Sequence, residues 1–181
     1  MNPITEKILS HLYSSIDAGF SYRMKKGLSI DGLFYDPWKS KNFKRTQIQD
    51  SLKELSRLKY IKKKQNYDGS ILVSLSEKGR LRILNMRFRR LNTKKEKWDG
   101  KWRMVSFDIP EERKKGRNAL RYRLRMAGFR EVQESLFLYP YDCEKEIRDF
   151  IELFKLQKYV RFGLLDFIDN QDGLKVIFKL T

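Results

Sequence analysis

A helical repeat followed at once by two short strand patterns constrains the fold of this chain more than any other feature. Four apolar side chains recur at helical spacing within residues 44–59: Ile48, Leu52, Leu55 and Leu58. Residues 60–64 and 71–75 have strand character, and Asp68-Gly69 between them is typical of a hairpin turn. The pattern predicts a helix packed by one face beside a two-stranded hairpin.

The opposite face of this helix and the hairpin are polar and basic. A helix fits the major groove of DNA, and a hairpin beside it can reach the adjacent backbone. The predicted DNA-binding residues of the helix are Lys44, Arg45, Thr46, Gln47, Gln49, Lys53 and Arg57. Those of the hairpin are Lys62, Lys63, Lys64, Asn66 and Tyr67. Arginine and glutamine can read bases, and lysine and threonine can hold phosphates.

Further helices complete this first predicted domain. Residues 3–18 and 76–91 have helical patterns, and a second helix is expected within 20–43 from Leu28, Ile30, Leu33 and Phe34. We therefore predict an N-terminal winged helix-turn-helix domain over residues 1–91. The alternatives are a winged helix that contacts protein or RNA, and an unrelated fold.

The charge distribution supports a polyanionic partner. Residues 1–100 hold 23 basic and 10 acidic side chains, whereas residues 101–181 hold 17 and 13. A basic first half predicts duplex DNA as the partner, against the alternative of a solubilising surface.

Several classes of site are excluded by composition. Cys143 is the only cysteine and His11 the only histidine, which excludes an internal disulfide, a cysteine zinc site and most Ser-His or Cys-His catalytic sites. No apolar run approaches transmembrane length, so we expect a cytoplasmic protein without a membrane partner.

The pattern changes after a polar stretch at residues 92–101, which we interpret as a linker. Strands are predicted at 102–108, 160–168 and 174–180, with one or two strands within 129–139, and helices at 110–127 and from Asp142 to about 156. The predicted turn between the last two strands is 169–173. This order fits a ferredoxin-like βαββαβ sandwich over residues 102–181, so the predicted fold class is α+β.

Several motifs carry a resemblance to known families. Residues 45–79, with a hairpin followed by Leu-Ser-Glu-Lys-Gly, resemble winged-helix regulators. The segments Phe-Asp-Ile-Pro-Glu at 107–111, Gly-Phe at 128–129, Val-Gln-Glu-Ser-Leu-Phe at 132–137 and Tyr-Pro-Tyr-Asp at 139–142 resemble two related families. One is the Cas-two family of small CRISPR-associated endonucleases, which act in spacer acquisition. The other is the PaaX-like family of transcriptional repressors, whose central domain has the same fold.

The PaaX-like resemblance implies a repressor that binds duplex DNA as a homodimer through residues 102–181, with no cofactor. The fusion to a winged helix favours this reading over a stand-alone nuclease. Full PaaX-like repressors usually continue into a further C-terminal region, so we do not expect their response to small molecules to carry over.

The Cas-two resemblance places a metal ligand and catalytic residue at Asp108. A pair of such aspartates, one from each subunit, can hold a divalent ion, and carboxylates suit magnesium. Magnesium is therefore expected only if the protein is a nuclease. The alternative is that Asp108 caps the helix beginning at Pro110. A third hypothesis is a non-catalytic scaffold that couples DNA to another protein.

A row of arginines at every fourth position is the last candidate site. Like charges at this spacing repel one another, and a phosphate backbone could offset the repulsion. The candidate phosphate-binding residues are Arg113, Arg117, Arg121 and Arg125. The alternative is a solvated helix face, with Glu111, Glu112 and Asp149 neutralising the row.

Overall fold

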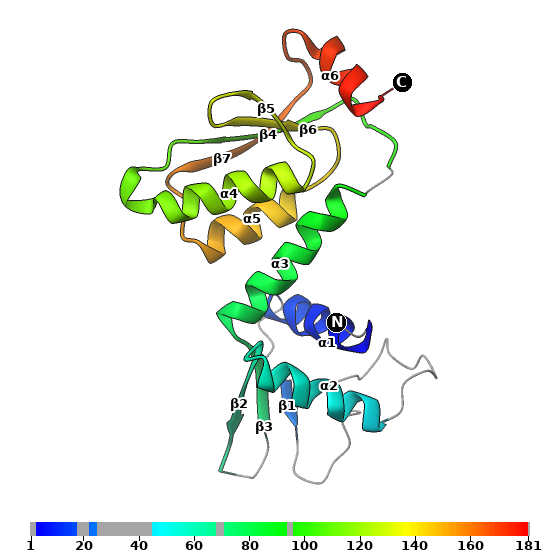
Figure 1. Ribbon diagram of the computed structural model, residues 1–181, viewed down its shortest axis with the longest axis vertical. Helices are drawn as coiled ribbons and strands as arrows, with labels where there is room; N and C mark the ends of the chain where they lie inside the picture. The colour runs from blue at the N-terminus through cyan, green and yellow to red at the C-terminus, as the bar shows by residue number, and fades with distance from the viewer. Residues whose placement is uncertain (1–2, 18–21, 25–44, 68–70, 94–95, 181) are drawn as a thin grey trace. The chain divides into compact units, whose positions relative to one another are not determined.

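The computed structural model describes residues 3–17, 22–24, 45–67, 71–93 and 96–180 (Figure 1). The chain divides into two compact units, Met1–Ile83 and Leu84–Thr181. Among the described residues, no helix is both long and apolar enough to cross a membrane.

The first unit contains two helices and a small antiparallel sheet. Its elements are α1 (Pro3–Asp17), β1 (Tyr22–Met24), α2 (Arg45–Arg57), β2 (Ile61–Gln65), β3 (Ile71–Leu75) and the start of α3 (Glu77–Leu91). The strand order is β1-β3-β2, so β3 is central and β2 is an edge. Leu9, Leu55 and Val73 are fully or almost fully buried in the core between the helices and the sheet.

The sequence predicted most elements of this unit. The expected helices at 3–18, 44–59 and 76–91 correspond to α1, α2 and α3, and the expected strands correspond to β2 and β3. β1 was not expected. The predicted second helix, with Leu28, Ile30, Leu33 and Phe34, lies outside the described residues, as does the Asp68-Gly69 turn.

The second unit is a four-stranded antiparallel sheet with helices on both faces. Its elements are β4 (Trp102–Phe107), a 3₁₀ turn (Glu111–Arg113), α4 (Lys114–Met126), β5 (Arg130–Gln133), β6 (Leu136–Tyr139), α5 (Glu144–Leu153), β7 (Val160–Leu165) and α6 (Gln171–Phe178). The strand order is β5-β6-β4-β7. The βαββαβ part with this antiparallel order agrees with the predicted α+β sandwich.

Alternation along the strands builds two apolar layers. Val105 and Phe137 point into the main core, which α4 and α5 cover with Leu124 and Phe150. Trp102 and Leu138 face the other side and pack with Leu174 of α6. α4 and α5 accordingly lie together on one side of the sheet, and α6 lies on the other (Figure 1).

The predicted strand at 174–180 is wrong, because this segment forms α6. Leu174, Val176 and Phe178 alternate as in a strand, but Leu174 and Phe178 are also one helical turn apart. In the helix these two residues pack against the sheet, while Val176 is 77% exposed. The predicted 169–173 turn is shorter for the same reason, since α6 begins at Gln171.

The division between the units falls earlier than the predicted boundary at residue 91. Leu84, Phe88 and Leu91 of α3 belong to the core of the second unit, whereas Ile83 belongs to that of the first. Part of the predicted linker 92–101 also packs on the second unit. The Trp98 and Trp102 rings lie 5.1 Å apart, and Trp98 Nε1 donates to the Lys101 carbonyl oxygen at 3.0 Å.

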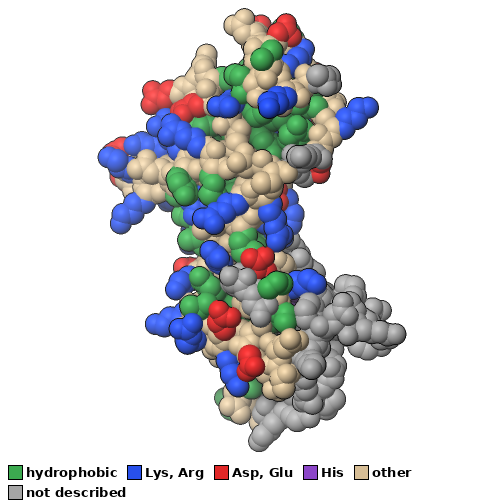
Figure 2. Space-filling view, turned by 45° about the vertical axis from the view of Figure 1, so that its right-hand side comes forward, with side chains coloured by type: hydrophobic (Ala, Val, Ile, Leu, Met, Phe, Trp, Pro, Cys, Tyr) green, Lys and Arg blue, Asp and Glu red, His purple; other side chains and the backbone are tan. Residues whose placement is uncertain are grey.

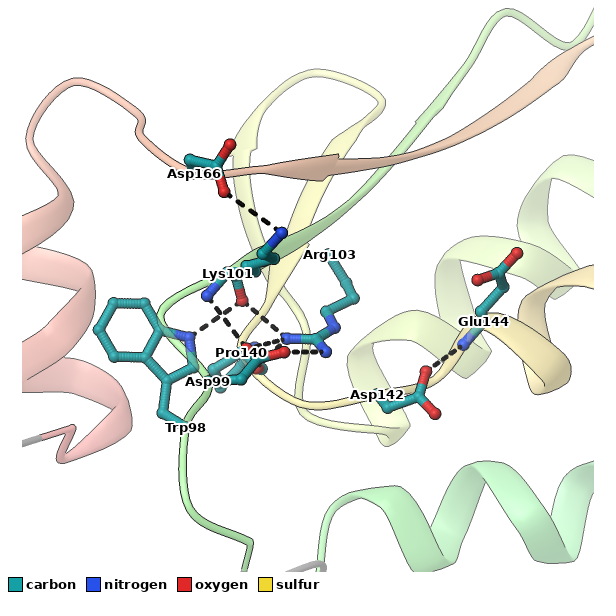
Figure 3. Close-up of polar contacts among 8 residues, drawn as sticks. All are labelled: Trp98, Asp99, Lys101, Arg103, Pro140, Asp142, Glu144 and Asp166. Carbon is teal, nitrogen blue, oxygen red and sulfur yellow. Dashed lines mark hydrogen bonds and ion pairs between the residues drawn. The ribbon is translucent and has the colours of Figure 1, made fainter.

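An ion pair fixes this segment at the start of β4 (Figure 3). The Arg103 guanidinium donates to both carboxylate oxygens of Asp99, at 2.6 and 2.7 Å, and to the Pro140 carbonyl oxygen at 2.9 Å. Arg103 is buried, and its hydrogen bond lowers the pKa of Asp99 to about 2. Residues 98–103 are therefore an ordered part of the second unit.

Candidate nucleic-acid interface

The outward face of α2 presents polar and basic side chains in a row. Thr46, Gln49, Lys53 and Arg57 are exposed and recur at helical spacing, so they share one side of the helix. The opposite side is apolar, with Leu52 and Leu55 buried against the core. This division leaves the whole row available to a partner; we call these four residues the α2 row.

An acidic residue, Asp50, lies beside the α2 row and was not included in the predicted interface. Its carboxylate is 3.4 Å from Lys53 Nζ, and both side chains are more than 70% exposed. An exposed pair of this kind contributes little free energy, so a phosphate can compete with Asp50 for the lysine. Its i, i+3 spacing from Lys53 was the signal in the sequence.

β2 adds a second basic segment. Lys62, Lys63 and Lys64 are all exposed, although successive residues of a strand point to opposite faces. Both faces of β2 are therefore open at these positions, and β2 is also an edge strand, paired only with β3. Lysines on an edge strand also discourage pairing with other chains. Their exposure alone therefore fits both DNA binding and protection of the edge.

A polar clamp joins the end of α2 to the base of the hairpin and to α3. Ser76 Oγ donates to the Lys59 carbonyl oxygen at 2.7 Å and accepts the Gly79 backbone N–H at 3.0 Å. The Ser76 N–H donates to the Tyr60 carbonyl oxygen at 3.0 Å. Lys78 Nζ donates to the Leu58 carbonyl oxygen at 3.1 Å and lies 5.3 Å from the centre of the Tyr60 ring.

Gly79 is required for this clamp. A Cβ atom at this position would lie 2.1 Å from the Tyr60 carbonyl oxygen. The Leu-Ser-Glu-Lys-Gly motif therefore has a physical role, because its serine caps α3 and its glycine allows α3 to approach the chain that leaves α2. The clamp holds α2 and β2, which pack against each other, in one arrangement.

The other predicted residues of this interface are placed as follows. Gln47 and Tyr67 are exposed, and Asn66 is half-buried. Lys44 lies outside the described residues. Arg45 is the first residue of α2, and the structure does not describe its side chain.

Asp108 lies in the second unit, immediately after β4, and is exposed. Its backbone N–H donates to the Tyr159 carbonyl oxygen at 2.9 Å. The predicted capping role is wrong, because the following 3₁₀ turn has Pro110 as its N-cap and no side-chain cap.

One chain does not supply a magnesium site at Asp108. The described residues contain no group of three or more His, Cys, Asp or Glu side chains that could hold a metal ion. Magnesium prefers several oxygen ligands, and a single carboxylate does not meet that requirement. A site shared with Asp108 of a second subunit, as the nuclease resemblance implies, therefore stays a prediction.

The arginine row of α4 is largely neutralised within the second unit. Arg117 pairs with Glu111 at 2.6 Å, and Arg125 pairs with Glu131 at 2.7 Å. Arg121 lies 3.5 Å from Glu134. These ion pairs favour the alternative of a neutralised helix face over phosphate binding.

Only part of the predicted neutralisation is present. Glu111 takes part, whereas Asp149 pairs instead with Arg87 at 3.2 Å. Arg113 donates to the Lys155 carbonyl oxygen at 3.2 Å and stacks over the Tyr159 ring. The acids at 131 and 134 were missed because they follow α4 on β5 and its turn, and only the fold brings them near.

Comparison with known families bears on the second unit. Residues 95–175 match the family described as the PaaX protein central Cas2-like domain. This stretch is a PaaX-type Cas2-like domain. The match confirms the resemblance to the PaaX-like family that the motifs at 107–142 indicated. The Cas2-like domain spans β4 to most of α6, and the match does not extend to α2 or the hairpin. Searches of curated proteins and of solved structures found no match to this chain.

Proposed function

We propose that this protein is a DNA-binding transcriptional regulator of the PaaX-like type, whose first unit acts as a winged helix. α2 enters the major groove with the α2 row toward the bases and phosphates, and the β2–β3 hairpin lies along the neighbouring backbone. The observation that supports this most is the exposure of the α2 row and of Lys62, Lys63 and Lys64 on two elements that pack together.

The charge of the chain supports the same partner. Its 40 basic side chains outnumber 23 acidic ones, and the excess lies mainly in residues 1–100. Each lysine or arginine that neutralises a DNA phosphate releases condensed counterions, so binding by this surface depends strongly on salt.

Homodimerisation through residues 102–181 is the second part of the proposal. It is supported by the PaaX-type Cas2-like domain and by symmetry, since two identical readers bind a site with two inverted halves. Cytoplasmic location and repression follow from the same family and remain part of the proposal.

A gel-shift titration tests the DNA surface. Lys53→Gln with Arg57→Gln removes two cations of the α2 row without touching the buried side. We expect about tenfold weaker binding at fixed salt, and a slope of log affinity against log salt smaller by about two. Unchanged affinity and slope would rule out this face.

Lys158→Gln is the matched control, because Lys158 is an exposed lysine of the second unit. Its affinity should remain within about twofold of the parent protein. Sedimentation at micromolar concentration tests the dimer, and a protein that sediments only as a monomer would contradict that part.

A further inference from the structure

A pocket of about 570 Å³ lies in the second unit. It is formed where the end of α3, the start of β5, the end of β6 and the end of α6 meet. Its walls include four aromatic rings: Phe129, Tyr139, Tyr141 and Phe178. On the face drawn in Figure 2, Lys and Arg side chains border an apolar surface of this unit.

The aromatic wall is built rigidly. The Phe129 and Tyr139 rings are stacked with centres 4.7 Å apart, and the Tyr141 ring meets Tyr139 edge-on at 5.6 Å. Tyr139 Oη donates to the Leu91 carbonyl oxygen at 2.7 Å, and burial raises the pKa of this phenol, so it stays protonated. Such a wall is formed before any ligand arrives, which lowers the entropic cost of binding.

The charged residues that line the pocket are all positive. Arg125, Arg130 and Lys179 line it, and none of its described lining residues is acidic. Arg125 pairs with Glu131, but the side chains of Arg130 and Lys179 have no hydrogen bond or ion pair to any residue that the structure describes. Two unpaired cations beside aromatic rings suit a ligand that is planar at one end and doubly negative at the other.

We propose that this pocket binds a nucleoside phosphate, with the base against the aromatic wall and the phosphate on Arg130 and Lys179. Bases of any sequence stack on aromatic side chains, and a phosphate monoester matches two cations in charge. The volume is within the range of ligand sites in proteins. The ligand is either a free nucleotide or the phosphorylated end of a strand, since both present this chemistry.

This site goes beyond DNA binding by the first unit. The family match ends at residue 175, whereas Ile177, Phe178 and Lys179 line the pocket. The match therefore does not assign it, and its lining residues include neither the α2 row nor Asp108.

Isothermal titration of the 181-residue protein without DNA tests the site, with adenosine monophosphate as the probe. We expect adenosine monophosphate to bind more tightly than either adenosine or inorganic phosphate, because base and phosphate are both recognised. The double substitution Arg130→Gln and Lys179→Gln should weaken the binding of adenosine monophosphate at least about tenfold. It should leave the affinity for adenosine unchanged. The control Lys158→Gln should bind like the parent protein.

Ile177→Glu is a second variant, because Ile177 is 50% exposed and its replacement leaves the core intact. The new negative charge at the pocket should also weaken the binding of adenosine monophosphate, because it repels the phosphate. A 5′-phosphorylated dinucleotide that binds more tightly than the mononucleotide would identify a strand end as the ligand, and weaker binding would identify a free nucleotide. Three results would overturn the proposal. They are the absence of binding by any nucleotide, phosphate binding as tight as that of adenosine monophosphate, and nucleotide binding that neither variant changes.

Discussion

At the scale of single residues, the Asp99 carboxylate shows how one buried arginine stabilises a chain segment. The Arg103 hydrogen bond lowers the pKa of Asp99 from 3.8 to about 2. The pair therefore stabilises the folded state above about pH 4, and this contribution is lost as the pH falls through about 2. The Asp99 side chain is 49% exposed, so solvent screening reduces the contribution to about 1 kcal/mol.

Asp99→Asn should lower the free energy of unfolding by about 1 kcal/mol at pH 7, and the difference from the parent protein should shrink between pH 4 and pH 2. Urea unfolding over this pH range measures both effects. Asp166→Asn is the control, since the exposed Lys101–Asp166 pair, 3.6 Å apart, should contribute almost nothing. Equal stability of the Asp99 variant and the parent at pH 7 would contradict this account.

The clamp between α2 and α3 depends on one glycine. Gly79→Ala places a methyl group 2.1 Å from the Tyr60 carbonyl oxygen, so the start of α3 must move. We expect a loss of about 2–3 kcal/mol in the free energy of unfolding, measured by urea titration. Ser76→Ala should cost about 1 kcal/mol through the lost cap, and Ser76→Thr should retain most of it. A Gly79→Ala protein as stable as the parent would show that this close approach is absent.

At the scale of elements, α6 allows a direct test between a helix and the strand that the sequence pattern predicted at 174–180. Gly173 lies within the first turn of α6, and a Cβ added there would meet no atom within 4 Å. Gly173→Ala should therefore raise the free energy of unfolding by about 0.5–1 kcal/mol, because alanine favours a helix. If residues 169–173 formed a glycine-dependent turn before a strand, the same change would destabilise the protein.

The elements show where sequence patterns suffice. The helical repeat from Ile48 to Leu58 excludes a strand, and α2 forms where it predicts. The segment after Gly173 satisfies both periods, and contacts with Trp102 and Leu138, distant in sequence, select the helix. The place of Trp98 and Asp99 in the second unit could not be predicted either, because the Pro140 carbonyl lies far along the chain.

The candidate interface was predictable in composition but not in arrangement. The α2 row and the lysines of β2 are exposed as the pattern indicates. The clamp that holds the two elements together depends on backbone carbonyls at residues 58–60, which no side-chain pattern reveals. The pairing of the α4 arginines with Glu131 and Glu134 also required the fold.

At the scale of the whole molecule, we propose that one unit binds DNA and the other forms the dimer. The first contains the exposed α2 row and the lysines of β2, and the second contains the PaaX-type Cas2-like domain through which we propose dimerisation. A dimer of DNA readers demands a target with two-fold symmetry, whereas a scaffold or a nuclease makes no such demand.

Selection of duplex DNA from a random library by the purified 181-residue protein tests DNA binding by a dimer most directly. We expect enrichment of two inverted half-sites with a fixed spacing, and loss of that enrichment in the protein carrying Lys53→Gln and Arg57→Gln. Recovery of no preferred sequence, or the same motif with this variant, would contradict it.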